Sequence, residues 1–132
     1  RDVAPSRGLG DVYKRQINSS GADMVISIHQ NSYVTPKAEG AQVFYYKKSE
    51  ESKRIAQIMQ GILGEKLGTT RQIKSDVNYY ILLHSKLPTI ISECGFLSNP
   101  EEEQRLCTEE YQEKVADALY CGIIEYLMMN MK

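Results

Sequence analysis

Short, nearly continuous apolar runs alternate along this chain with longer segments in which apolar residues recur every three or four positions. Residues 24–28 (MVISI) predict a strand covered on both faces, and residues 41–46 (AQVFYY), rich in β-forming types, predict a second strand. Residues 79–83 (YYILL) and 89–93 (TIISE) are further short apolar runs, and Pro88 suits the start of a strand in the latter. These runs predict the strands of a sheet that helices cover.

Helix signals lie between and after these runs. Ser49 is an N-cap candidate for an amphipathic segment that ends at Gly68, because glycine accepts the left-handed conformation of a helix end. Asn99 followed by Pro100 and three glutamates predicts another helix start. Thr108 caps a last helix, whose apolar face comprises Tyr111, Val115, Ala118, Leu119, Gly122, Ile123, Tyr126 and Leu127. The pattern predicts an α/β fold with a mixed, largely parallel twisted sheet flanked by helices.

The first 16 residues lack this order. Residues 1–16 show no period of 2 or 3.6 until their last few positions and contain one proline and two glycines, so they predict an irregular leader. From Asp11 onward a short helix is compatible with the pattern, and residues 18–21 (NSSG) would end it. We therefore divide the chain into a leader, residues 1–16, and one domain, residues 17–132.

Composition excludes several classes of protein. The 132 residues include 16 Lys or Arg and 17 Asp or Glu, giving a formal net charge of −1, and 42% are hydrophobic. This describes one compact domain without the positive field that attracts nucleic acid. No apolar stretch approaches the roughly 20 residues that span a bilayer, and the N-terminus lacks the apolar core of a signal peptide. Cys94, Cys107 and Cys121 form no CxxC pair, so they indicate neither a cysteine zinc site nor a complete disulfide framework.

Two polar residues follow or end predicted strands. His29 follows residues 24–28, and Glu93 ends residues 89–93, so parallel neighbouring strands would bring them together. An imidazole can ligate zinc, and a nearby carboxylate in a low-dielectric wall can act as general base toward a metal-bound water. A lone histidine is, however, more often a satisfied polar residue than a metal ligand. Glu93 would be costly to bury alone, so its placement calls for a partner, a metal or a function.

Cysteine chemistry is a different possibility. Cys94 could act as a nucleophile with His29 or His84 as its base. A cysteine that follows a buried strand is more often a small hydrophobic residue, and His84 is expected to be structural or solvated.

Two further groups of residues could contact a substrate. Arg71 and Lys74, in a predicted loop, could bind a carboxylate or contact only water. The tyrosine pairs at 45–46 and 79–80 could line a sugar or peptide groove, or pack half-buried as strand residues.

Three longer segments resemble a known family. They occur in the order seen in zinc-dependent N-acetylmuramoyl-L-alanine amidases: residues 21–32 (GADMVISIHQNS), 40–46 (GAQVFYY) and 88–99 (PTIISECGFLSN). The resemblance covers about residues 17–130. The sequence motifs HQNSY and ECGFLSN most resemble those of the germination-specific members found in spore-forming bacteria.

This resemblance implies a hydrolase that cuts the amide between N-acetylmuramic acid and L-alanine in peptidoglycan, in the cell wall or spore cortex. His29 matches a ligand of the family's Zn²⁺ cofactor, and Glu93 matches the catalytic glutamate that takes a proton from the zinc-bound water. Asn31 and Arg71 match positions near the cleft and are expected as substrate contacts. The family's substrate implies a location outside the cytoplasmic membrane.

The chain also departs from the family. The Asp-Pro-Gly-His-Gly type motif with the first histidine ligand is absent, as is the glutamate ligand that follows it, which leaves His29 as one of three expected ligands. Residues 1–16 resemble the family only at Lys14 and Arg15, so we expect foreign sequence there. The resemblance implies an N-terminally truncated domain, without its first strand and helix, that holds zinc weakly. A non-catalytic peptidoglycan-binding module and a purely structural α/β domain are the alternatives.

Overall fold

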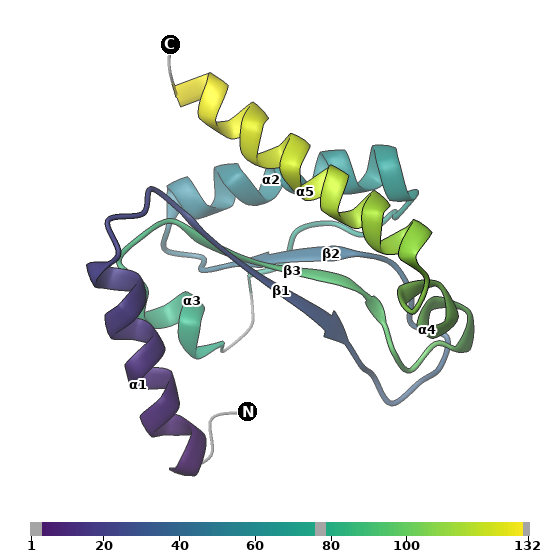
Figure 1. Cartoon of the computed structure of the whole chain (residues 1–132), viewed down its shortest axis with the longest axis horizontal. Helices are drawn as coiled ribbons and strands as arrows, with labels where there is room; N and C mark the ends of the chain where they lie inside the picture. Colours follow the sequence, from purple (N-terminus) through teal and green to yellow (C-terminus); the bar gives the residue numbers. More distant parts are fainter. Residues whose placement is uncertain (1–3, 76–78, 131–132) are drawn as a thin grey trace.

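The computed structural model describes residues 4–75 and 79–130, which form five helices and three strands (Figure 1). In chain order these elements are α1 (Ala4–Ser19), β1 (Val25–Asn31), β2 (Gln42–Tyr45), α2 (Glu50–Leu67), α3 (Tyr80–His84), β3 (Thr89–Phe96), α4 (Pro100–Leu106) and α5 (Glu109–Asn130). None of these helices is both long and apolar enough to cross a membrane.

The sheet is mixed, as the sequence predicts. Its strand order is β1-β3-β2, with β1 parallel and β2 antiparallel to the central β3. In Figure 1 α2 and α5 lie above the sheet and α3 lies below it. The predicted α/β sheet flanked by helices is therefore confirmed.

The larger core fills the space between the sheet and the helices α2 and α5. Val43 and Ile90 from the sheet pack there with Ile55, Met59 and Leu63 of α2, all at most 1% exposed. A smaller cluster on the opposite face joins Phe44 and Ile91 of the sheet to Leu82 of α3. The side chains of β2 and β3 alternate between these two clusters because successive residues of a strand point to opposite faces.

Local capping signals are confirmed. Ser49 accepts a hydrogen bond from the amide of Ser52, and α2 ends at Gly68 with φ of 77°. Asn99 accepts hydrogen bonds from two amides of the first turn of α4, and Thr108 accepts one from an amide in the first turn of α5. These caps depend on neighbours in sequence, which explains why sequence alone locates them.

The predicted irregular structure is wrong for residues 4–10, which belong to α1. The short helix that the pattern allowed from Asp11 is part of the same helix, which ends at Ser19 as residues 18–21 indicated. A glycine inside a helix costs only about 1 kcal/mol, and a proline is tolerated in the first turn. Packing against α3 favours the helix: a Cβ at Gly10 would lie 3.3 Å from the ring of Tyr80. The hydroxyl of Tyr80 also donates a hydrogen bond to Asp11. Residues 1–3 lie outside the described residues.

Three details of the predicted strands differ from the structure. β1 is an edge strand of the described sheet, with Ile28 58% exposed, so coverage on both faces is wrong for β1 and applies to β3. β3 continues past Glu93 to Phe96. The pair at 79–80 is not in a strand, because Tyr79 is the N-cap of α3.

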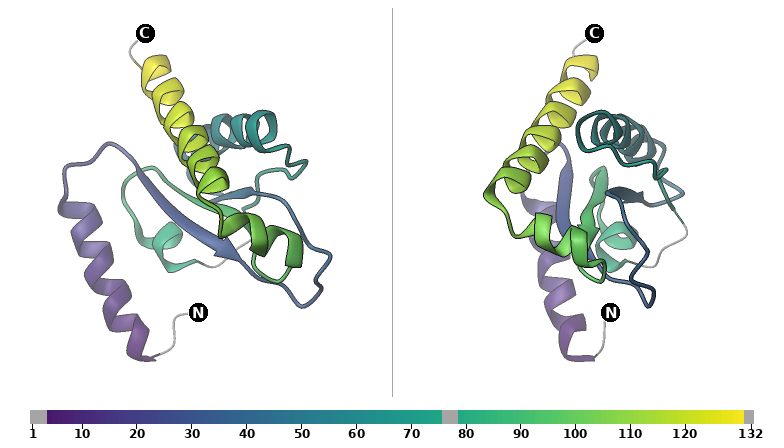
Figure 2. Two further views of the ribbon diagram at one scale, coloured as in Figure 1. Left: turned by 45° about the vertical axis from the view of Figure 1, so that its right-hand side comes forward. Right: turned by 90° about the vertical axis from the view of Figure 1, so that its right-hand side faces the viewer.

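The C-terminal half of α5 extends beyond the sheet, as both views in Figure 2 show. Large apolar side chains are exposed on this half, including Tyr120 at 63% and Met128 at 61%. The predicted buried face is confirmed at Val115, Leu119 and Tyr126.

Candidate active site

The parallel pairing of β1 and β3 places His29 directly opposite Glu93. Paired residues of neighbouring strands project from the same face of a sheet, here the face that carries α3. Glu93 is 3% exposed, whereas His29 is exposed to solvent. The arrangement sets an accessible imidazole beside a carboxylate in the protein wall, as the sequence predicts.

The surroundings of Glu93 combine apolar packing with a hydroxyl group. Tyr79 donates a hydrogen bond to Oε1 of Glu93 over 3.4 Å. The ring of Tyr79 packs against Phe44, with centroids 5.9 Å apart and planes tilted by 57°. The carboxylate of Glu93 is therefore buried beside an aromatic ring and receives a hydrogen bond from a hydroxyl group.

His29 is oriented by its own strand. Its Nε2 lies 2.6 Å from Oγ of Ser27, which projects from the same face. A metal bound through Nε2 would displace this contact. The hydroxyl of Ser27 therefore holds the imidazole on this face of the sheet.

The donor set of the described residues does not form a complete zinc site. No group of three or more His, Cys, Asp or Glu side chains in residues 4–75 and 79–130 is arranged to hold a metal ion. Catalytic zinc normally takes three protein ligands, and His29 supplies one.

Asn31 and Arg71 lie at the margins of this strand end. Asn31 pairs with Phe96 across the sheet, and its Oδ1 accepts a hydrogen bond from the amide of Ser32 over 2.8 Å. The guanidinium of Arg71 stacks over the ring of Phe96, 4.6 Å from the centroid. Phe96 therefore lies between the two predicted substrate contacts.

Arg71 is tied to the protein rather than fully solvated. Its Nε donates to the carbonyl of Glu39 over 2.6 Å, and its Nη1 donates to Oε1 of Gln42 over 3.1 Å. Gln42 in turn pairs with Glu93 across β2 and β3. Gln42 is a link between the predicted cation and the buried carboxylate that no sequence signal indicated.

Glu102 is a second residue that sequence reasoning did not single out. It is 5% exposed and accepts hydrogen bonds from the amides of Gly40, at 3.0 and 3.1 Å, and Phe96, at 2.8 Å. Arg105 lies 3.5 Å from its Oε2. Glu102 thus fixes the end of the loop after β1 to the end of β3. It stands among three consecutive glutamates, and nothing local distinguishes the buried one.

The geometry disfavours cysteine chemistry. Cys94 belongs to the core cluster on the α2 and α5 face, opposite the face of His29 and Glu93. Burial raises the pKa of the Cys94 thiol to about 11, and the negative charge of Glu93 adds to the rise. His84 stacks on Tyr80 at the end of α3, with ring centroids 4.1 Å apart. A thiol that stays protonated and buried is a poor nucleophile.

Comparison with known proteins gives a consistent result. A family model described as N-acetylmuramoyl-L-alanine amidase matches residues 11–125, beginning inside the segment 1–16 that we set apart as a leader. The germination-specific N-acetylmuramoyl-L-alanine amidase of Bacillus subtilis (strain 168) is 41% identical over 111 residues, which cover 83% of this chain and 47% of that protein. The chain thus spans about half the length of this relative.

Solved structures share the fold. The CwlD amidase from Clostridioides difficile, solved in complex with the GerS lipoprotein, is 35% identical with a TM-score of 0.87, covering 97% of this chain and 67% of that one. The catalytic domain of CwlV, an N-acetylmuramoyl-L-alanine amidase from Bacillus (Paenibacillus) polymyxa var. colistinus, is 28% identical with a TM-score of 0.81. That match covers 89% of this chain and 65% of that domain. With a family match over most of its length and this shared fold, the chain belongs to the N-acetylmuramoyl-L-alanine amidase family.

Proposed function

We propose that this chain is part of an enzyme that hydrolyses the amide between N-acetylmuramic acid and L-alanine in peptidoglycan. The observation that carries the proposal is the pairing of His29 with Glu93 on adjacent parallel strands. The accessible imidazole and the buried carboxylate are the two groups that a metal-assisted amide hydrolysis needs side by side. Family membership supplies the substrate class.

Glu93 is the proposed proton-transfer group. It would accept a proton from the attacking water while the water oxygen forms a bond to the amide carbon. When the carbon–nitrogen bond breaks, the same carboxyl would return the proton to the departing amine. The products are a carboxylate on the lactyl group and a new amino terminus on L-alanine. Arg71 and Asn31 are the proposed contacts to the substrate on either side of Phe96.

Zinc dependence is also part of the proposal. His29 would be one ligand, and further ligands would come from outside the described residues, because these supply no three-residue cluster. When bound, zinc would polarise the amide carbonyl and lower the pKa of the attacking water.

The location follows from the substrate. Peptidoglycan lies outside the cytoplasmic membrane, so we propose that the enzyme acts there. The name of the Bacillus subtilis relative, a germination-specific amidase, supports a role in germination.

The assignment of Glu93 is tested by amide hydrolysis. In the whole protein, Glu93→Gln keeps the shape of the side chain but removes its basicity, so we expect the release of amino termini from purified peptidoglycan to fall at least about 100-fold. Glu101→Gln, on the exposed first turn of α4, is the matched control and should retain wild-type activity. Full activity in Glu93→Gln would show that another group transfers the proton.

The assignment of His29 is tested by zinc binding to the 132-residue chain. Titration with Zn²⁺ should give weak binding, because one imidazole is a poor site by itself, and His29→Ala should weaken it at least about tenfold. His84→Ala removes the other histidine, on α3, and should leave binding unchanged. Equal affinity in the wild type and His29→Ala would contradict the assignment.

A non-catalytic peptidoglycan-binding module is the second candidate, and the single-histidine donor set favours it. Such a module would sediment with insoluble peptidoglycan and release no amino termini. A purely structural domain would do neither.

A further inference from the structure

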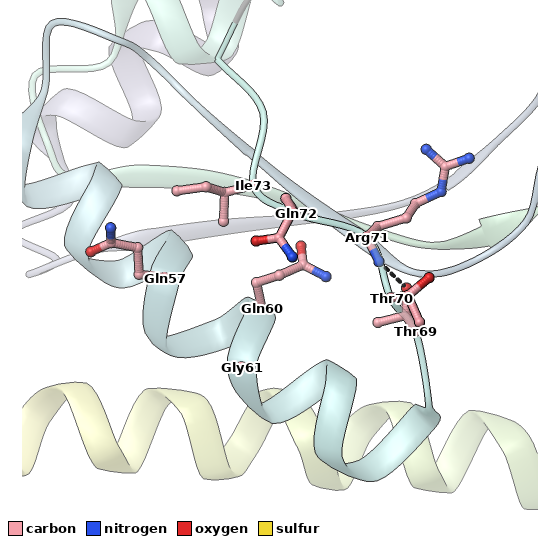
Figure 3. Close-up of a pocket in the computed structure, with 8 residues that line it drawn as sticks. All are labelled: Gln57, Gln60, Gly61, Thr69, Thr70, Arg71, Gln72 and Ile73. Atoms are coloured by element: carbon pink, nitrogen blue, oxygen red, sulfur yellow. Dashed lines mark hydrogen bonds between the residues drawn. The ribbon is translucent and has the colours of Figure 1, made fainter.

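A polar hollow lies outside the candidate active site, between α2 and the segment of residues 69–73. Its volume is about 340 Å³, near the lower end of small-ligand sites. Figure 3 shows the side chain of Gln60 from α2 close to that of Gln72, while Gln57 lies one turn earlier on α2 and also lines the hollow. α2 covers the sheet face opposite His29 and Glu93, so the hollow is not part of their site.

The back wall of the hollow is already ordered by internal hydrogen bonds. Gln60 is 7% exposed, and its amide accepts from the amide of Val43 over 2.8 Å and donates to the carbonyl of Ala41 over 3.2 Å. Thr69 donates to the same carbonyl of Ala41 over 2.8 Å. The carbonyl of Gln72 accepts from the side chain of Gln42 over 2.8 Å. The shape of the wall is thus fixed by the protein itself.

The front of the hollow carries polar groups of a different kind. The side chains of Gln57, Thr70 and Gln72 line the hollow and are exposed. Among the described residues, the hydrogen bonds that order the back wall do not involve these three side chains. Each side chain can both donate and accept, and each is neutral. Arg71 is the charged residue of the lining, and Figure 3 shows its guanidinium turned away.

These features select a ligand by its chemistry. Neutral donors and acceptors suit hydroxyl and acetamido groups, whereas phosphates and carboxylates would meet no cation inside the hollow. The volume suits one sugar-sized unit rather than an extended chain. We propose that the hollow binds an N-acetylhexosamine unit of a glycan strand, an inference that rests on the proposed function for its choice of polymer.

The segment that lines the hollow also contacts the candidate active site. Thr70 and Gln72 border the hollow, while Arg71 between them reaches Gln42, the partner of Glu93 across the sheet. The segment of residues 70–72 therefore contacts both the hollow and the candidate active site.

Titration of the 132-residue chain with the β-1,4-linked dimer of N-acetylglucosamine tests this assignment by NMR. We expect saturable shifts of the side-chain amide signals of Gln57 and Gln72, and at least a tenfold loss of affinity in the Gln57→Ala/Gln72→Ala double variant. Gln104→Ala removes an exposed amide on α4 and should bind as the wild type does. Absence of saturable shifts, or equal affinity in the double variant, would overturn the proposal.

Two more ligands test the chemical class. Cellobiose has the same ring framework without acetamido groups and should bind at least several-fold more weakly. The free stem peptide should not shift these signals. Equal binding of cellobiose, or binding of the peptide instead of the sugar, would contradict the assignment to an N-acetylhexosamine.

The outcome separates this proposal from that for the active site. Glu93→Gln should bind the sugar dimer with wild-type affinity, because Glu93 lies on the other face of the sheet. Sugar binding without amide hydrolysis would contradict the proposed function but support the hollow as a glycan-binding site. Amide hydrolysis without sugar binding would support the proposed function and contradict the glycan-binding site.

Discussion

At the scale of single residues, the position of each side chain relative to the two sheet faces decides what it can do. Glu93 and Cys94 are neighbours in sequence, yet they belong to opposite faces. Glu93 receives a hydrogen bond from Tyr79 on the face of His29. Cys94 lies in the main core, where burial raises its pKa.

The raised pKa of Cys94 predicts a pH dependence of stability. The thiol has a pKa of about 11 when folded against 9.0 in the reference state, so the folded chain holds this proton more tightly. The contribution to the free energy of unfolding is complete below pH 9 and is lost as the pH rises toward 11, by an amount on the order of 2 kcal/mol.

Urea unfolding at pH 8 and pH 11 measures this loss. Cys94→Ala removes the thiol, so the difference between the two pH values should be smaller in the variant than in the wild type. Tyr126, whose pKa burial also raises, remains in both proteins and contributes equally. The pKa of Tyr111 is raised mainly by burial, and the charge of Cys94 adds a smaller part that the variant lacks. An identical difference in the two proteins would contradict the assignment to Cys94.

Residue roles were predictable where they followed from strand pairing. His29 and Glu93 could be placed together because each accompanies an apolar run and parallel strands align their ends. The roles of Gln42 and Glu102 could not be recognised from the sequence. Glu102 binds the amide of Gly40, 62 residues away, and Gln42 binds Arg71, 29 residues away. Such partners are set by the tertiary fold, which short sequence windows do not record.

At the scale of elements, the packing of α5 on α2 depends on a glycine. A Cβ at Gly122 would lie 2.5 Å from Sδ of Met59, a residue that is 0% exposed. Gly61, on the exposed side of α2, has nothing within 4 Å of the corresponding position. A side chain at position 122 would therefore clash with Met59, whereas position 61 has room for one.

Replacing each glycine by alanine should change stability in opposite directions. Gly61→Ala should raise the free energy of unfolding by about 0.5–1 kcal/mol, because alanine restricts the unfolded chain and favours a helix. Gly122→Ala should lower it by about 1 kcal/mol, because crowding against Met59 outweighs the same helix preference. Urea unfolding of both variants measures the effect, and an equal gain in both would contradict this packing.

Elements with local signals were predictable, and those that depend on tertiary contacts were not. The caps at Ser49 and Asn99 lie within a few residues of their partners. The helix α1 has two glycines and a proline, and its contacts to α3 join Asp11 and Tyr80 over 69 positions of sequence. Local propensity therefore gave the wrong answer for α1.

At the scale of the whole molecule, the fold and the family agree, and the sheet brings the two proposed catalytic groups together. The strand order β1-β3-β2 aligns His29 with Glu93, and the described residues hold no three-ligand metal cluster. The alternation of strands and helices allowed the sequence to predict the α/β class. The antiparallel position of β2 and the edge position of β1 depend on long-range pairing, so the sequence did not determine them.

The central claim concerns which bond the whole protein cuts, and the identity of the new amino terminus tests it most directly. Purified peptidoglycan is digested with the whole protein in the presence of Zn²⁺, and the amino groups released are derivatised and identified. The account predicts L-alanine as the new amino-terminal residue, absent from a digest with Glu93→Gln. A different amino-terminal residue, or new reducing sugar ends in place of amino groups, would contradict it.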